Sequence, residues 1–112
     1  MQAAESPARL DQLFFALADS TRRGMVDRLS QGPASVSELA RPLSMAMPSV
    51  VKHLAVLEAG GLVTSEKAGR VRTYRMAPTG LADMERWVAA RKAQWNAQLD
   101  RLDAFLAEKP TE

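Results

Sequence analysis

Residues 44–76 read SMAMPSVVKHLAVLEAGGLVTSEKAGRVRTYRM, and this stretch decides the fold. It contains a short helical segment, then two glycines, then two strand-forming runs joined by a basic turn. This order is typical of a helix that reads DNA followed by a β-hairpin wing. We therefore expect a helix-turn-helix over residues 35–59 and a wing over residues 62–76.

The helix expected over residues 47–59 has two faces. At 100° per residue its core-facing side chains fall within one narrow sector; they are Val50, Leu54 and Leu57. The far side carries Ser49, Lys52 and Val56, and His53 lies between the faces. Because the polar face is short and cationic, we expect its N-terminal residues to meet base edges and Lys52 to meet phosphate or guanine.

The helix before it should be short. Ser35 and Glu38 have the spacing of a capping box, which starts a helix, and Pro42 disfavours helical geometry at Arg41. A tight turn over residues 43–46 then leads into the reading helix.

Beyond the reading helix, Gly60 and Gly61 should end it, one of them in the left-handed conformation. Residues 62–64 and 71–76 then pair as strands around a turn at residues 68–70. Arg70 and Arg72 project from the tip or shoulder of this hairpin. Guanidinium groups placed there can enter a minor groove or pair with phosphates.

Two more helices are expected before residue 33. The first starts at Ser6 and Pro7 and spans residues 7–18; its apolar face consists of Leu10, Leu13, Phe14 and Leu17. The second follows a cap at Asp19 and Ser20 and ends at Gly32 and Pro33; it turns Met25, Val26 and Leu29 inward and Arg22, Arg23 and Arg28 to solvent. Gly24 costs this helix about 1 kcal/mol relative to alanine, which indicates a close approach of another helix.

A long helix over residues 79–107 should close the chain. Its apolar residues recur at spacings of three, four or seven; they are Leu81, Met84, Val88, Trp95, Leu99, Leu102 and Leu106. A helix of this length extends about 43 Å, too far for one small core to cover. We therefore expect a second subunit, packed through the first and last helices, that places the two reading helices about 34 Å apart.

Composition limits the classes of function. The 112 residues are 46% hydrophobic and 25% charged, which fits one domain over residues 1–112. Cysteine is absent, which excludes disulfides and thiolate metal sites, and neither a signal peptide nor a membrane span is evident. We expect a cytoplasmic protein without cofactor. The net charge is only +2, but residues 64–75 hold four basic side chains against one acidic, the footprint of a polyanion binder.

Three strings, KHLAVLEAGGLV, KAGRVRTYRM and ALADSTRRGMVDRLSQG, resemble the ArsR/SmtB family of bacterial winged-helix repressors. The likeness covers about residues 10–106 and is greatest to the branch with a GRVR-type wing and a tryptophan-containing last helix. It implies a homodimer that binds operator DNA and represses transcription, with Arg22 and Arg23 close to the DNA backbone.

The chain departs from the family pattern at three places. Some metal-sensing members carry cysteines in the helix before the reading helix, where this chain has SVSELARPL. Others bind metal through histidines and carboxylates on the last helix, whereas the only histidine here, His53, lies in the reading helix. Metal sensing is therefore not expected. Ala46 and Val51 stand where the family often has serine, which removes a helix cap and one polar DNA contact, and Ser49 compensates in part.

The expected function is that of a sequence-specific, homodimeric repressor and not of an enzyme. The residues expected to contact DNA are Arg22, Arg23, Ser35, Met47, Ser49, Lys52, His53, Lys67, Arg70 and Arg72. Those expected at the dimer interface are Leu10, Leu13, Phe14, Leu17, Met84, Val88, Trp95, Leu99 and Leu102.

Three alternatives stay open. Trp87 and Trp95 could line a pocket for an unknown small-molecule effector instead of packing in the interface. The same surface could bind a protein, as in a winged-helix adaptor that does not bind DNA. A small hydrolase could use His53 with Ser49 and either Asp83 or Glu58, although no glycine-rich elbow or oxyanion motif accompanies these residues.

Overall fold

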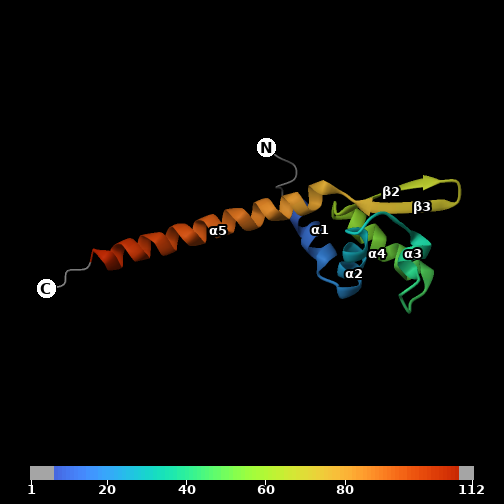
Figure 1. The fold of residues 1–112 in the computed structure, drawn as a ribbon, viewed down its shortest axis with the longest axis horizontal. Helices are drawn as coiled ribbons and strands as arrows, with labels where there is room; N and C mark the ends of the chain where they lie inside the picture. The colour runs from blue at the N-terminus through green and yellow to red at the C-terminus, as the bar shows by residue number, and fades with distance from the viewer. Residues whose placement is uncertain (1–6, 109–112) are drawn as a thin grey trace.

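The computed structural model describes residues 7–108, which form five helices and one three-stranded antiparallel sheet. In chain order the elements are α1 (Pro7–Leu17), α2 (Ser20–Leu29), β1 (Ala34–Ser35), α3 (Val36–Ala40), α4 (Met47–Ala59), β2 (Val63–Ala68), β3 (Val71–Met76) and α5 (Pro78–Ala107). Helices α1 to α4 gather beside the sheet, and α5 leaves this body as a long rod (Figure 1). The predicted winged helix-turn-helix is confirmed; the cap predicted at Ser6 lies outside the described residues.

The ends of the helices follow local sequence signals. The Asp19 carboxylate accepts the backbone N–H of Arg22 at 3.1 Å and caps α2, as predicted. Ser35 and Glu38 form the predicted capping box at the start of α3. Arg41, however, keeps helical dihedrals (φ −53°, ψ −46°). The prediction that Pro42 disfavours helical geometry at Arg41 was therefore wrong. Helix α3 ends here because Pro42 has no N–H with which to continue it.

The sheet has the order β1-β3-β2, with β3 in the centre. Strands β2 and β3 pair from Val63 opposite Met76 to Ala68 opposite Val71, which leaves a two-residue turn. β2 therefore ends at Ala68, beyond the predicted end at residue 64. The prediction missed β1, which is only two residues long and exists because Ala34 and Ser35 pair with Tyr74 and Thr73.

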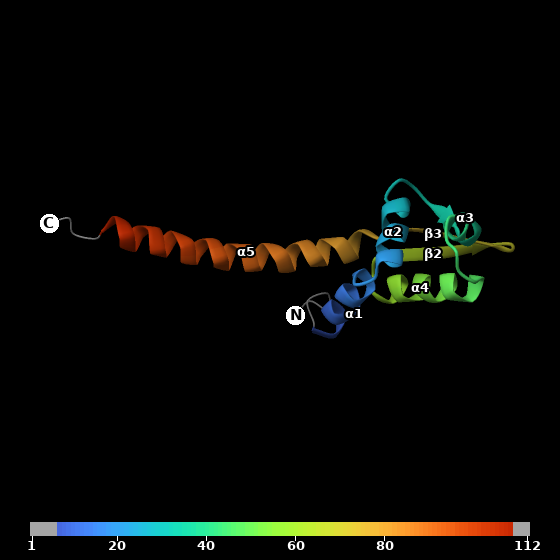
Figure 2. The ribbon, with the colours of Figure 1, turned by 90° about the horizontal axis from the view of Figure 1, so that it is seen from below.

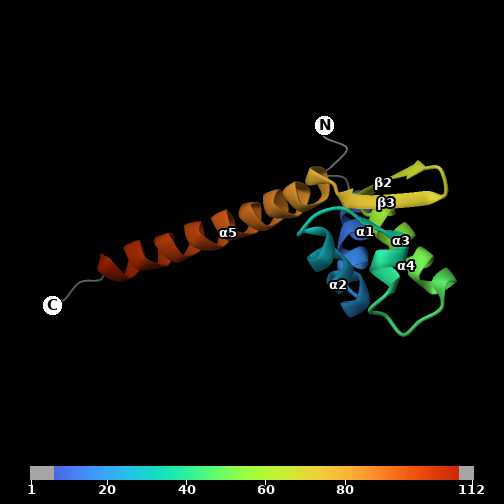
Figure 3. The same cartoon turned by 45° about the vertical axis from the view of Figure 1, so that its right-hand side comes forward.

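Helices α1 to α4 lie on one face of the sheet, as Figure 3 shows, and the buried core side chains come from these helices and from the strands. The most buried large side chains of the core come from α4, from the first residue of β2 and from the residue just before it; they are Val50, Leu54, Leu57, Leu62 and Val63. The inward face predicted for α4 is thus confirmed. Val56 was expected on the outward side but is half-buried against this core. Gly61, at φ +76°, ends α4 in the predicted left-handed conformation.

Helix α5 is attached to the body only at its start. A Cβ at Gly80 would collide with the Gly61 carbonyl, so only glycine allows this approach. One turn later the buried Asp83 carboxylate pairs with Arg86 and, at 3.4 Å, with Arg9 of α1. All residues from Glu85 to Glu108 are exposed, and the molecule is 77 Å long. The predicted need for a partner helix therefore has a structural basis.

Candidate nucleic-acid interface

The N-terminal half of α4 presents a free surface. Ser49 and Lys52 are exposed, as are Met47 and Val51, while His53 is only 22% exposed at its side chain. Ala46 occupies the N-cap position and offers no side-chain cap, as predicted. The first turn of α4 lies at the same end of the molecule as the tip of the β2–β3 hairpin, opposite the free end of α5 (Figures 1 and 2).

The β2–β3 hairpin carries exposed cations at this end. Lys67, Arg70 and Arg72 are all exposed, and Arg70 lies in the turn that joins the strands. Arg72 Nη1 donates to Ser65 Oγ at 2.8 Å, and Ser65 Oγ donates to Glu58 Oε2 of α4 at 3.2 Å. The hairpin is therefore tied to the reading helix. This role of Ser65 was not predicted, because it depends on strand register and on the position of α4.

Arg22 and Arg23 bind the C-terminal carbonyls of α1. Arg22 Nε donates to Ala16 O at 2.8 Å and Nη2 to Phe15 O at 2.9 Å, while Arg23 Nη1 donates to Leu17 O at 2.8 Å. Carbonyls at a helix C-terminus lack intrahelical partners and carry partial negative charge, which basic side chains neutralise. Arg22 is only 8% exposed, so the expectation that it faces solvent was wrong; Arg23 is exposed, as expected.

Arg22 also reaches the reading helix. Its Nη1 lies 3.1 Å from Nδ1 of His53, and the same imidazole nitrogen lies 4.0 Å from Oδ2 of Asp19. The hydrogen bond from the Arg22 backbone N–H holds the pKa of the Asp19 carboxyl below its ordinary value, and the positive charge of Arg22 lowers this pKa further. These three side chains connect the start of α2 with the middle of α4.

The predicted dimer residues differ in how far the subunit itself buries them. Leu13 is 2% exposed and belongs to the core of the subunit, so its assignment to the interface was wrong; Leu10 and Leu17 are half-buried beside it. Phe14 is exposed and meets Trp87 of α5 edge-on, with ring centroids 5.4 Å apart. Met84 is half-buried, and the remaining members lie exposed along α5; they are Val88, Trp95, Leu99 and Leu102, joined by Phe105 and Leu106.

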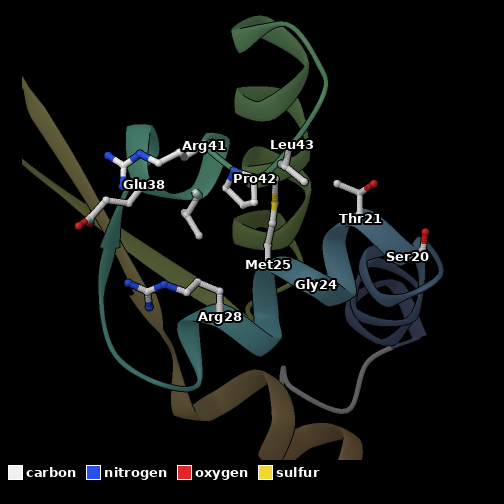
Figure 4. Close-up of a pocket in the computed structure, with 10 residues that line it drawn as sticks. Ser20, Thr21, Gly24, Met25, Arg28, Glu38, Arg41, Pro42 and Leu43 are labelled. Carbon is white, nitrogen blue, oxygen red and sulfur yellow. The ribbon is translucent and has the colours of Figure 1, made fainter.

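A concavity of about 580 Å³ lies between α2 and α3 (Figure 4). Its apolar lining comes from Met25, Leu39, Pro42 and Leu43. The hydroxyl groups of Ser20 and Thr21 lie toward one end, and the charged groups of Arg28, Glu38 and Arg41 lie toward the other. Gly24 faces this open space, and among the described residues no heavy atom outside the adjoining backbone of its own helix lies within 4 Å of the position of an added Cβ. The close helix approach predicted at Gly24 was therefore wrong.

The two tryptophans do not share a pocket. Trp87 lines a smaller concavity of about 310 Å³ between α1 and α5, together with Leu10, Asp83, Arg86, Ala90 and Arg91. Trp95 lies two turns further along α5, on the free part of the helix. Its side chain is exposed and does not line this concavity.

The residues considered for a hydrolase are not brought together. His53 contacts Arg22, the Glu58 carboxylate accepts from Ser65, and Asp83 pairs with Arg9 and Arg86. Residues 7–108 contain no group of three or more histidine or carboxylate side chains placed to hold a metal ion. None of the helices in the described part of the chain has the length and apolar character needed to cross a membrane.

Comparison with known proteins places these features among transcriptional regulators. Residues 17–66 match a family described as a helix-turn-helix domain. Over 85 residues the chain is 47% identical to the HTH-type transcriptional regulator Rv2034 of Mycobacterium tuberculosis, covering 71% of this chain and 79% of that protein. It is 41% identical over 68 residues to the arsenical resistance operon repressor of Escherichia coli, covering 60% of this chain and 58% of the repressor.

Solved structures of transcriptional regulators have a similar fold. The crystal structure of an ArsR family transcriptional regulator is similar with a TM-score of 0.78 and 45% identity, covering 81% of this chain and 94% of the other. A homodimeric winged helix-turn-helix DNA-binding domain from Mycobacterium bovis, solved by NMR, is similar with a TM-score of 0.61 and 25% identity, covering 83% of this chain and 94% of the other. The described fold and the two-subunit arrangement thus occur together in a similar protein.

Proposed function

The chain belongs to the ArsR/SmtB family of helix-turn-helix transcriptional regulators, and we propose that it is a homodimeric repressor that binds operator DNA. One observation carries the proposal: the exposed first turns of α4 and the cationic tip of the wing lie at the same end of the molecule. A helix and a hairpin so placed can engage a groove and its flanking backbone together.

Within this proposal the exposed residues divide the recognition between them. Met47, Ser49 and Lys52 of α4 meet base edges and phosphate in the major groove. Lys67, Arg70 and Arg72 meet the backbone or the minor groove from the wing. Arg23 and Ser35 contribute contacts to the backbone, and Ser35 does so while its hydroxyl caps α3.

The second subunit packs against α1 and α5. The support is the length of α5 beyond its anchor, with exposed apolar side chains on the free part, together with the exposed ring of Phe14. The twofold axis of a dimer presents two α4 helices to successive major grooves, one turn of duplex or about 34 Å apart. A symmetric operator follows from that geometry.

Regulation is proposed to come from a small molecule in the concavity between α2 and α3 and not from a metal. This chain carries the GRVR wing without cysteines, as in a branch that does not sense metals through thiolates. The apolar lining suits an amphipathic molecule, and Arg28 and Arg41 against the single carboxylate of Glu38 leave a positive excess that favours an anion. Because Pro42 and Leu43 of its wall begin the turn that leads through residues 44–46 into α4, a bound molecule would shift the reading helix.

The test is DNA binding as a function of salt, measured by fluorescence anisotropy with labelled promoter DNA and with random duplex. Phosphate contacts release counterions, so the affinity should fall steeply and linearly on logarithmic axes as salt rises. A protein adaptor that uses the same surface would bind neither duplex. Absence of binding to both duplexes at low salt would refute the proposed repressor.

A further inference from the structure

Arg22 is a junction between three elements. Its backbone N–H donates to the Asp19 carboxylate, and its Nε and Nη2 donate to carbonyls in the last turn of α1. The third guanidinium nitrogen, Nη1, lies 3.1 Å from Nδ1 of His53 on α4. The guanidinium also lies over the Phe15 ring, with Cζ 5.0 Å from the ring centroid. A side chain held at so many points has little freedom to reach DNA, but it determines how α4 sits against α1.

The contact with His53 specifies a tautomer. An arginine guanidinium only donates hydrogen bonds, so Nδ1 of His53 must accept. A neutral imidazole with an accepting Nδ1 carries its proton on Nε2. The competing tautomer would donate from Nδ1 to Asp19, but 4.0 Å between the imidazole nitrogen and Oδ2 is too long for a hydrogen bond.

We propose that Arg22 is a positioning residue for DNA recognition, which ties α4 to the C-terminus of α1 and holds His53 as the tautomer with a proton on Nε2. This inference rests on the proposed DNA-binding function of α4. Its consequence is that His53, one turn after Ser49, offers DNA a donor. Guanine O6 and N7, adenine N7, thymine O4 and phosphate oxygens accept such a bond, whereas the amino groups of adenine and cytosine cannot.

The arrangement also links reading to dimerisation. The carbonyls that Arg22 binds belong to Phe15 and Ala16, at the end of the helix that we propose packs against the second subunit. Loss of Arg22 would therefore loosen α4 relative to the dimer interface, while none of the side chains that we propose to contact phosphate is removed. Arg22 would therefore act by positioning α4, whereas the family resemblance implies that it contacts the DNA backbone directly.

The tautomer can be measured directly by nitrogen-15 NMR of the imidazole, in the full-length protein without DNA. His53 is the only histidine in the chain, so its signals need no assignment. In the spectrum of the neutral imidazole we expect a proton on Nε2 alone in the wild type. In Arg22→Met both tautomers become accessible, and the two nitrogen shifts should move toward each other.

Arg23→Met is the matched control for the spectrum, because Arg23 binds the same end of α1 but does not contact His53 in the described structure. It should leave the two imidazole shifts unchanged. A wild-type spectrum with the proton on Nδ1, or unchanged shifts in Arg22→Met, would overturn the proposal. The wild-type spectrum alone remains decisive for the tautomer if Arg22→Met does not fold.

The effect on DNA is measured with a labelled duplex that the wild-type protein selects from a random-sequence library. Arg22→Met should weaken its binding about tenfold through loss of a charge-assisted hydrogen bond, with the salt dependence of affinity unchanged. If Arg22 instead neutralises a phosphate, the salt slope of the variant falls by about one unit for each such phosphate, and that result refutes the positioning role. Failure of the wild type to select any duplex would refute DNA binding, while the spectrum would still report the tautomer.

Discussion

Leu102→Asp should convert the dimer into monomers. Leu102 lies on the free part of α5 and is 51% exposed in the isolated subunit. It continues the spacing of Trp95 and Leu99 by steps of four and three residues, which places the three side chains on one face. A carboxylate at this position would face the second subunit.

The magnitude follows from burial and symmetry. Complete burial of a leucine stabilises by about 1.5–3 kcal/mol, so covering the exposed half of Leu102 contributes about 1 kcal/mol per subunit. A twofold interface contains two copies, which doubles this loss to about 2 kcal/mol. Desolvation of the two carboxylates adds further cost, so the total is at least about 3 kcal/mol. The dissociation constant of the dimer should therefore rise more than about 100-fold.

Sedimentation equilibrium over a range of protein concentrations measures this constant. The matched control is Ala104→Asp, which places the same charge two residues away and off the Leu102 face; it should remain dimeric. Circular dichroism should show an equal helix content for both variants. An undiminished dimer in Leu102→Asp would show that this part of α5 lies outside the interface and would remove the second subunit from the explanation of the long helix.

Three further changes test the wing and the helix ends. Replacement of both Arg70 and Arg72 by alanine should reduce the slope of log affinity against log salt by up to about 3.6 for the dimer; an unchanged slope would exclude the wing from phosphate contact. Gly24→Ala should raise the free energy of unfolding by about 0.5–1 kcal/mol in urea titrations, since space is open there; a decrease would reveal an unseen neighbour. Hydrogen bonds from the backbone and side chain of Ser35 keep the pKa of Glu38 below its ordinary value, so the stabilisation is present above the unfolded pKa and is lost on acidification through the folded pKa. On acidification below about pH 4.5, Glu38→Gln should therefore lose less free energy of unfolding than the wild type. Parallel curves of unfolding free energy against pH for the two proteins would contradict a charged capping box.

Local signals were sufficient for the reading helix and most helix ends. The bounds of α4 were predicted to the residue, because an apolar face at helical spacing is flanked by Pro48 near its start and by Gly60 and Gly61 at its end. The end of α5 was likewise predicted, and its start was misplaced by one residue because Pro78 is the first residue of the helix and not its predecessor.

Features that depend on tertiary pairing could not be predicted in this way. Nothing in its immediate sequence distinguishes Arg22 from Arg23, yet one is buried and the other exposed. The difference arises because Arg22 faces α1 and α4 together, which only the packed structure defines. Leu13 illustrates the same limit, since an apolar stripe does not reveal whether it packs within the subunit or against another.

The selection of genomic DNA fragments by the purified full-length protein tests the central claim most directly. A homodimeric repressor with two α4 helices should enrich fragments that contain an inverted repeat, with half-site centres about 10 base pairs apart or a multiple of that spacing. The enriched sequences should be bound more tightly than random duplex at the same salt concentration. Enrichment of sites without twofold symmetry, or no enrichment over random DNA, would contradict a symmetric reader of operator DNA.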